Sequence, residues 1–198
     1  MAIQAPSSPD TAPVMDLALE ERPPVTGEEL SKMGNIGRTE LIKGEIVYMA
    51  PTGHLHGSIE GNLYAAIRAF VQQHGLGRVM VGEVGLYTAR DPDTVRGADV
   101  VFISHERLAR VKSQSYLDVA PDLIVEILSP EDRWLGTMEK LEEYFAIGVR
   151  VVWVVDTRMH TIYVYRSLTD VQRFTAEEEL PGGDVLPGFS MPVKEMFA

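Results

Sequence analysis

Two acidic residues lie beside or inside apolar stretches of this 198-residue chain, where a charge is costly unless something pairs with it. Asp99 stands at the start of the stretch Ala98–Ile103, and Glu126 lies in the middle of Leu123–Leu128. Hard cations such as Mg²⁺ take oxygen ligands and keep several waters, so two converging carboxylates suffice to hold one. The alternative is that each acid caps a strand end or pairs with an arginine. If the two strands are neighbours, the pattern favours a shared cation site.

Lys140 follows Glu126 on the next predicted helix. At about 100° per residue it shares one flank with Thr137 and Tyr144, and also with Arg133. The apolar stripe beside this flank is expected to face the sheet, and it consists of Trp134, Met138, Leu141 and Phe145. On such a flank a lysine could look toward Glu126 and orient a water or offset charge on a phosphate. The alternative is an ordinary exposed lysine on a helical Glu/Lys face.

Three further residues are candidates for the same site. His56 opens the first long predicted helix, where it could serve as a base or contact a phosphate, or simply cap or pack. Glu45 and Glu83 lie in predicted strands and could add cation ligands, although acids on the solvent face of a strand are common. The motifs of nucleotide-binding loops, zinc sites and serine nucleophile elbows are missing from the sequence.

The segment around Glu126 predicts the unit that must position these groups. Leu123–Leu128 and Val149–Val155 are short apolar runs rich in Ile and Val, as expected of strands buried on both faces. Between them, Ser129 can cap a helix, Pro130 suits its first position and Gly148 can end it. Two buried strands joined by a helix imply a parallel pair with a right-handed crossover.

The rest of the chain extends this unit to an α/β fold with a central mixed β-sheet flanked by helices and carrying extra hairpin strands. A hairpin with a Lys43–Gly44 turn is expected near the start, and short helices at 26–30 and 193–197. The predicted long helices are Leu55–His74 and Glu131–Ile147, and the strands of one sheet are Val79–Tyr87, Ala98–Ile103, Leu123–Leu128 and Val149–Val155. Residues 1–24, rich in Pro, Ser and Ala, are predicted to be a mobile tail, and 25–198 a single domain.

Composition narrows the function classes. The chain is 45% hydrophobic and 24% charged, as globular domains are. It lacks cysteine, which excludes disulfides and thiolate metal sites and fits a cytoplasmic location. No apolar run is long enough to span a membrane, and the N-terminus does not have the pattern of a secretory signal. The net charge of −11 argues against a broad electrostatic attraction to nucleic acid.

Taken together, these segments resemble the Uma-type family of "putative restriction endonucleases", which belongs to the PD-(D/E)XK nuclease superfamily. The resemblance covers roughly residue 25 to the C-terminus and depends on the order and spacing of its motifs. The matching stretches are ELIKGEIVYM, the His56–Gly57 helix start, GADVVFIS, PDLIVEILSPED, Lys140 with Glu143–Tyr144, GVRVVWVVD and LPGFSMPVKEMF.

The resemblance implies a restriction-endonuclease-like fold, with Asp99 and Glu126 as Mg²⁺ ligands and Lys140 as the catalytic lysine. Two positions depart from the superfamily pattern. Ala98 replaces the proline before the first acid, and Leu128 stands two residues after Glu126, where the superfamily usually has its lysine. Lys140, on the following helix, is similar to the displaced lysine of related members.

Two functions are therefore considered. The first is a metal-dependent endonuclease acting on DNA, with Mg²⁺ or Mn²⁺ as cofactor, in which Asp99, Glu126, Lys140 and His56 carry the reaction. Its acidic body would need a local basic cleft, formed by Arg90, Arg96 and Arg133, or a second subunit in a homodimer. The second is a catalytically inactive member that uses the same fold as a binding or interaction module. Binding of a divalent metal would separate the two.

Overall fold

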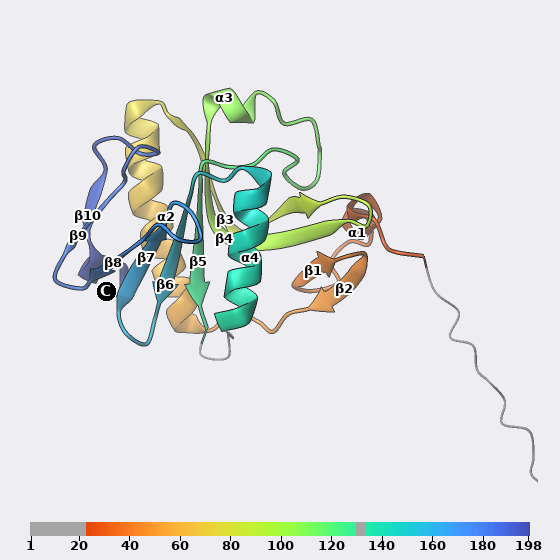
Figure 1. Cartoon of the computed structure of the whole chain (residues 1–198), viewed down its shortest axis with the longest axis horizontal. Coiled ribbons are helices and arrows are strands. Elements are labelled where there is room, and N and C mark those ends of the chain that lie inside the picture. Colours follow the sequence, from red (N-terminus) through yellow and green to blue (C-terminus); the bar gives the residue numbers. More distant parts are fainter. Residues whose placement is uncertain (1–22, 130–133) are drawn as a thin grey trace, which may run out of the picture.

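A computed structural model describes residues 23–129 and 134–198 of the chain (Figure 1). Its main feature is an eight-stranded sheet in the order β2-β1-β4-β5-β6-β7-β8. The long strand β4 pairs with β1 and β5 at different positions, and β3 pairs with β4 along its length. The strands of this sheet are β1 (Thr39–Ile42), β2 (Glu45–Tyr48), β3 (Gly77–Ala89), β4 (Thr94–Ser104), β5 (Leu123–Leu128), β6 (Val151–Asp156), β7 (Thr161–Tyr165) and β8 (Val171–Thr175). The four strands that the sequence predicts for one sheet are all in it.

The sheet is mixed, as predicted. β5 and β6 run parallel in register from Leu123 opposite Val151 to Leu128 opposite Asp156, and the other strand pairs are antiparallel. Helix α4 (Trp134–Ile147) makes the crossover between β5 and β6. The prediction of a parallel pair joined by a helix is therefore confirmed. Pro130, the proposed first helical position, and Glu131, the proposed start of the helix, lie outside the described residues.

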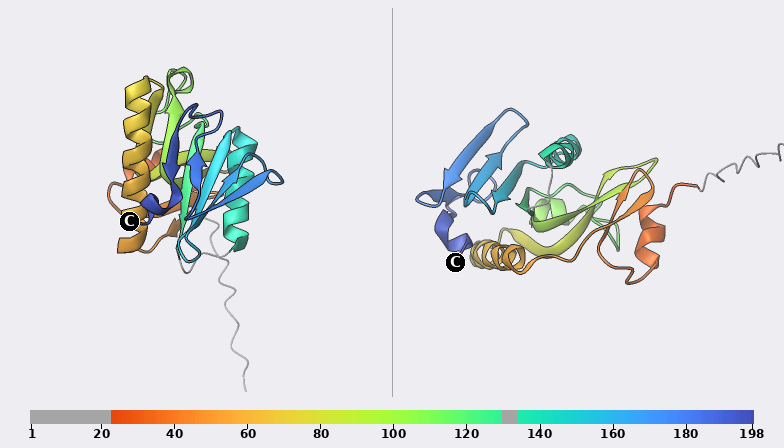
Figure 2. Two further views of the ribbon diagram at one scale, coloured as in Figure 1. Left: turned by 90° about the vertical axis from the view of Figure 1, so that its left-hand side faces the viewer. Right: turned by 90° about the horizontal axis from the view of Figure 1, so that it is seen from below.

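Two long helices cover opposite faces of the sheet (Figure 2). Helix α2 (His54–His74) buries Ile59, Leu63 and Ile67 against one face, and Gly75 ends it in the left-handed conformation. Helix α4 packs on the other face. Because successive residues of a strand point to opposite faces, β4 and β5 contribute alternately to both cores.

The shorter elements sit at the ends of the sheet. A Thr26 capping box starts α1 (Gly27–Lys32), and the predicted hairpin β1–β2 turns at Lys43–Gly44. Helices α3 (His105–Leu108) and α5 (Val193–Met196) are single turns. No helix in the described ranges is long and apolar enough to cross a membrane.

The buried face of α4 is shifted from the face that the sequence predicts. Trp134 is 57% exposed, and the buried residues are Thr137, Leu141 and Tyr144. Met138 and Phe145 only flank this core. The helix is rotated toward the flank that carries Lys140 because Tyr144, amphipathic and fully buried, finds a hydrogen-bond partner on the sheet.

The sequence also misses three strands near the C-terminus. The apolar patterns predict no strand at β8, β9 (Glu179–Pro181) or β10 (Ser190–Pro192). β9 and β10 form a separate two-stranded sheet. The exposed residues of β8 and the shortness of β9 and β10 leave little apolar alternation for a sequence pattern to detect.

Candidate active site

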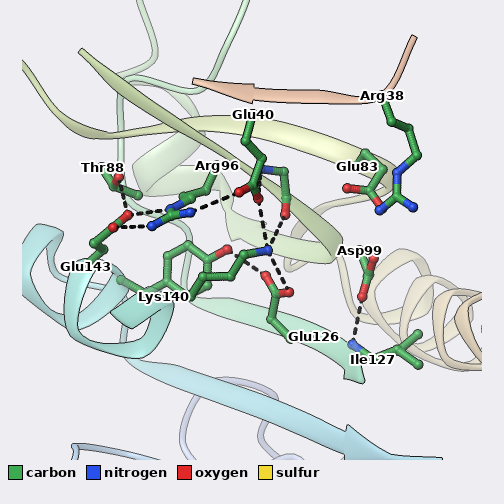
Figure 3. Close-up of polar contacts among 12 residues, drawn as sticks. Arg38, Glu40, Glu83, Thr88, Arg96, Asp99, Glu126, Ile127, Lys140 and Glu143 are labelled. Carbon is green, nitrogen blue, oxygen red and sulfur yellow. Dashed lines mark hydrogen bonds and ion pairs between the residues drawn. The ribbon is translucent and has the colours of Figure 1, made fainter. Parts of the chain in front are cut away.

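The candidate site lies in a fork where the pairing of β4 with β5 ends. The ladder runs from Phe102 opposite Leu123 to Val100 opposite Val125. One residue further along, Asp99 and Glu126 follow on the two strands. The backbone amide of Ile127 donates to the Asp99 carboxylate at 2.7 Å, where a regular ladder would offer it a backbone carbonyl (Figure 3). Asp99 and Glu126 therefore stand side by side at the fork, as the sequence predicts for neighbouring strands.

A bulge in β3 brings a second carboxylate to Asp99. Val81 pairs with Val100 and Val84 with Ala98, so Gly82 and Glu83 together oppose Asp99. Both residues have positive φ, 91° at Gly82 and 56° at Glu83. A non-glycine residue in this conformation is uncommon, and bulges recur next to active sites.

The lack of a side chain at Gly97 leaves room for the Glu83 carboxylate. A Cβ at residue 97 would stand 2.7 Å from Oε2 of Glu83. Arg38, which comes just before β1, forms an ion pair with the same carboxylate. The guanidinium of Arg38 also donates to the carbonyl of Ala50 and to the hydroxyl of Thr52, both at 2.9 Å.

His56, near the start of α2, reaches the site from the face of the sheet that α2 covers. Its Nε2 lies 3.1 Å from Oδ1 of Asp99. This approach is not aligned as a hydrogen bond, so neither buried ring nitrogen has a hydrogen-bond partner in the described part of the chain. Burial would lower the pKa of His56, but the contact with Asp99 and the charges of Glu60 and Glu83 raise it.

His56, Glu83 and Asp99 form a group that could hold a metal ion. One ligand atom from each lies within 4.8 Å of the others. Burial and the charge of Asp99 raise the pKa of Glu83 to about 7. Acidic groups held so close together, beside a buried imidazole without a hydrogen-bond partner, have the composition of a divalent-cation site.

Lys140 points into the fork from α4. Its Nζ lies 3.2 Å from Oε2 of Glu126 and 3.0 Å from Oε1 of Glu40, and it donates to the carbonyl of Gly97 at 3.3 Å (Figure 3). Burial would lower the pKa of Lys140, but the charges of Glu126 and Glu40 outweigh it and raise the pKa. The prediction that this ammonium faces Glu126 and not bulk solvent is confirmed, and the lysine stays charged at neutral pH.

Glu126 is held from two sides. The hydroxyl of Tyr144 donates to its Oε1 at 2.6 Å, while Lys140 contacts Oε2. Burial raises the pKa of Glu126 to about 7 against the opposing charge of Lys140. Each carboxylate oxygen has two lone pairs, so Glu126 keeps acceptor capacity for a further partner.

A buried ion network behind the site connects α4 to the sheet. Arg96 of β4 binds Glu143 through Nε at 2.8 Å and through a terminal nitrogen at 2.5 Å, and it binds Glu40 of β1 at 3.0 Å. Burial would raise the pKa of Glu40, but Lys140 and Arg96 lower it. The network therefore holds both partners of Lys140. Arg96 binds Glu40 directly, and its contact with Glu143 fixes α4, whose Tyr144 binds Glu126.

The groups open into one cavity of about 700 Å³. Its floor contains His56, Glu83, Asp99, Glu126 and Lys140, and part of its wall is apolar, with Met49, Pro51, Leu55 and Leu128. Asp99, Glu126, Lys140 and His56, the four residues singled out from the sequence, thus meet in one place.

Of the two uncertain glutamates, Glu83 joins the site, whereas Glu45 is exposed on β2 and does not line the cavity. Sequence reasoning missed Glu40, Tyr144 and Arg38. Glu40 had a usable signal, because it is an acid directly before the apolar pair Leu41–Ile42, as Asp99 is before its own apolar run.

The basic cleft expected from the sequence is not formed by the residues proposed for it. Arg90 stacks on the ring of Tyr87, at 3.4 Å from its centroid, and pairs with Glu28 and Asp93. Arg96 is buried between Glu40 and Glu143. Arg133 lies outside the described residues. Arginines placed among so many acids are neutralised by them, so they provide no free positive surface.

Comparisons with known proteins agree with this architecture. The model of a family described as "Uma2: Putative restriction endonuclease" matches residues 27–194. Among solved structures, the chain is similar to a crystal structure of "a putative nuclease belonging to DUF820" from Anabaena variabilis, with a TM-score of 0.73 at 20% identity. The match covers 88% of this chain and 98% of the other, and at this identity it shows a shared fold. No curated protein matches the chain.

Proposed function

Since the chain belongs to the Uma2 family of "putative restriction endonucleases", we propose that it hydrolyses phosphodiester bonds of DNA with the help of a divalent cation, Mg²⁺ or Mn²⁺. The observation that carries this proposal is the meeting of carboxylates from three strands, two of them buried and one half-buried, with one charged lysine in a single cavity. The proposed nuclease domain spans residues 25–198.

The cation would be held around Asp99. Glu83 and His56 offer ligand atoms beside it, and Glu126 follows on the neighbouring strand. The donor set fits, because acids with raised pKa and an imidazole without a hydrogen-bond partner supply the oxygen and nitrogen ligands that divalent cations bind. When bound there, the cation supplies activation of a water and stabilisation of the charge that develops on the phosphate.

Lys140 would offset negative charge on the reacting phosphate or orient the attacking water. Its raised pKa keeps the ammonium protonated, so it acts as a charge and a hydrogen-bond donor and not as a base. Glu126, Glu40 and the carbonyl of Gly97 hold the ammonium in place. Tyr144 in turn orients Glu126.

His56 would position Asp99 before the cation arrives. Its ring lies against the Asp99 carboxylate, and the raised pKa favours the protonated form in that state. Because a histidine coordinates metal only when the ligating nitrogen is deprotonated, cation binding would release that proton. His56 then either coordinates the cation or takes up a proton during the reaction.

Incubation of plasmid and single-stranded DNA with the protein tests this proposal. Cleavage is expected with Mn²⁺ or Mg²⁺, none with EDTA, and none by an Asp99→Ala variant. A calorimetric titration with Mn²⁺ provides the second readout, since an Asp99→Ala, Glu126→Ala double variant should lose the binding heat. A wild-type protein that neither binds the cation nor cuts DNA would instead be a binding module that keeps the fold.

A further inference from the structure

One segment of the chain is nearly free of acidic residues. Residues 46–82 contain a single acid, Glu60, whereas the whole chain contains 29. This segment forms most of β2, the loop before α2, the whole of α2 and the first part of β3. Glu60 is itself engaged, because its Oε1 accepts the hydrogen bond of the Gly82 amide at 3.0 Å. A polyanion would therefore meet less repulsion at this segment than the net charge of −11 of the whole chain suggests.

A continuous ridge on this segment starts at the candidate active site. It consists of a row of α2 residues four positions apart, in which each residue neighbours the next while the row winds gradually round the helix: His56, Glu60, Tyr64, Arg68 and Gln72. The ridge faces β3, which runs beside α2 (Figure 1). At one end His56 meets Asp99, and Glu60 contacts the bulge of β3 that carries Glu83.

The other end of the ridge opens into a groove of about 440 Å³ between α2, β3 and α3. Tyr64, Arg68 and Gln72 line it from α2, Arg78 from β3, and His105 from α3. Arg68 and Arg78 are exposed, and within the described ranges neither forms an ion pair with an acid. Arg68 lies 5.9 Å from the ring centroid of Tyr64. This contrasts with the cavity, where Arg38 is paired with Glu83 and Lys140 with Glu126.

We propose that a DNA strand held in the cavity continues along the flank of α2 and that Arg68 and Arg78 bind its phosphates in the groove. This inference rests on the proposed function. The chemistry is that of backbone recognition, in which arginine guanidinium groups neutralise phosphate charge without reading sequence. It also supplies the positive surface that Arg90 and Arg96 do not.

The length of the path along α2 sets how many nucleotides separate the groove contact from the bond that is cut. Twelve residues separate His56 from Arg68, and at about 1.5 Å per helical residue the groove lies roughly 18 Å from the cavity. Phosphates along one strand of B-DNA follow one another at about 3.4 Å of helix axis. The groove should therefore contact the backbone about five nucleotides away from the bond that is cut.

The salt dependence of DNA binding tests the path. A Lys140→Ala background with Mg²⁺ present slows cleavage, so that binding of a fluorescent duplex can be followed by anisotropy. Each phosphate contact contributes about 0.9 to the slope of log K against log salt concentration. In this background Arg68→Ala with Arg78→Ala should make the slope less negative by about 1.8. Arg173→Ala is the matched control, because Arg173 is also an exposed strand arginine, on β8 at the far edge of the sheet.

The outcomes separate the two proposals. A less negative slope in the double variant and an unchanged slope in Arg173→Ala support the path along α2. An unchanged slope in the double variant, with DNA still bound, overturns this path and leaves the proposed nuclease standing. Absence of any DNA binding by the Lys140→Ala protein, together with absence of cleavage by the wild type, overturns the proposed function itself. Circular dichroism of each variant shows that its fold is retained.

Discussion

At the scale of single residues, the site brings the carboxylates of Asp99 and Glu83 together, and a bound cation would offset their mutual repulsion. Asp99 and Glu83 meet because a ladder ends at Asp99 and a bulge turns Glu83 toward it. Burial and the charge of Asp99 raise the pKa of Glu83, so part of the repulsion is relieved by protonation while no cation is bound. Such an arrangement is costly for folding and is retained where function needs it.

Gly97→Ala should weaken cation binding without disturbing the fold. The new Cβ would stand 2.7 Å from Oε2 of Glu83 and push that carboxylate away from Asp99. Displacing one ligand should lower Mn²⁺ affinity in calorimetry by at least about tenfold, the lower end of what loss of an outer-shell partner costs. Gly61→Ala is the control, because no heavy atom lies within 4 Å of a Cβ at that position. Equal affinities in both variants would remove Glu83 from the ligand set.

The sequence predicts the residues of the site better than their contacts. Asp99 and Glu126 are detectable because a charge within an apolar strand needs a reason, and Lys140 because of its place after Glu126. Glu83 could be named only as a candidate, since its inward direction depends on a bulge for which Gly82 is the single sequence signal. Tyr144 was placed on the flank of Lys140 but was given no role, and Glu40 was missed because its partners Arg96 and Lys140 are distant in sequence.

At the scale of elements, the rotation of α4 decides where Lys140 points. Apolar periodicity indicates a face with Trp134, but the helix turns its Thr137–Tyr144 flank to the sheet. Two polar contacts fix this rotation, Tyr144 with Glu126 and Glu143 with Arg96. The presence of the buried strands follows from local apolar patterns, whereas a helix rotation set by buried polar pairs does not.

Arg96→Met should destabilise the protein by about 3–5 kcal/mol, because it leaves Glu40 and Glu143 without their shared buried cation. Urea denaturation measures the free energy of unfolding. Arg166→Met, which removes a more exposed pair with Asp170 at 3.8 Å, should cost no more than about 1 kcal/mol. Similar losses in the two variants would mean that the Arg96 network does not hold α4 in place.

At the scale of the whole molecule, cation binding should act as a stabilising ligand. Any ligand that binds only the folded state contributes about 2.7 kcal/mol at a hundred times its Kd. For a chain of this size that corresponds to a Tm increase of about 5–10 °C. Differential scanning calorimetry with MnCl₂ should show this shift for the wild type.

Asp99→Asn provides the control for the cation shift. It keeps the shape of the side chain and an oxygen that can accept from the Ile127 amide, but removes the charge. Its Tm should respond little to MnCl₂. An equal shift in both proteins would place the cation elsewhere on an acidic surface and not in the fork.

The whole molecule also shows where composition misleads. A net charge of −11 argues against a nucleic-acid partner, yet the charge is unevenly distributed along the chain. The nearly acid-free segment from residue 46 to residue 82 can be read in the sequence, but its position beside the active site follows only from the packing of α2 against β3.

The central claim is that Lys140 acts on the reacting phosphate in a cation-dependent site, and the rate of plasmid cleavage at saturating Mn²⁺ tests it most directly. Lys140→Ala should cut roughly 10²–10³-fold more slowly than the wild type, the scale of losing one donor to developing charge. Lys140→Arg should restore little of the cleavage rate, because the planar guanidinium of arginine does not replace the compact ammonium of lysine. Mn²⁺ affinity should be nearly unchanged in both variants. Cleavage by Lys140→Ala at the wild-type rate would contradict this account.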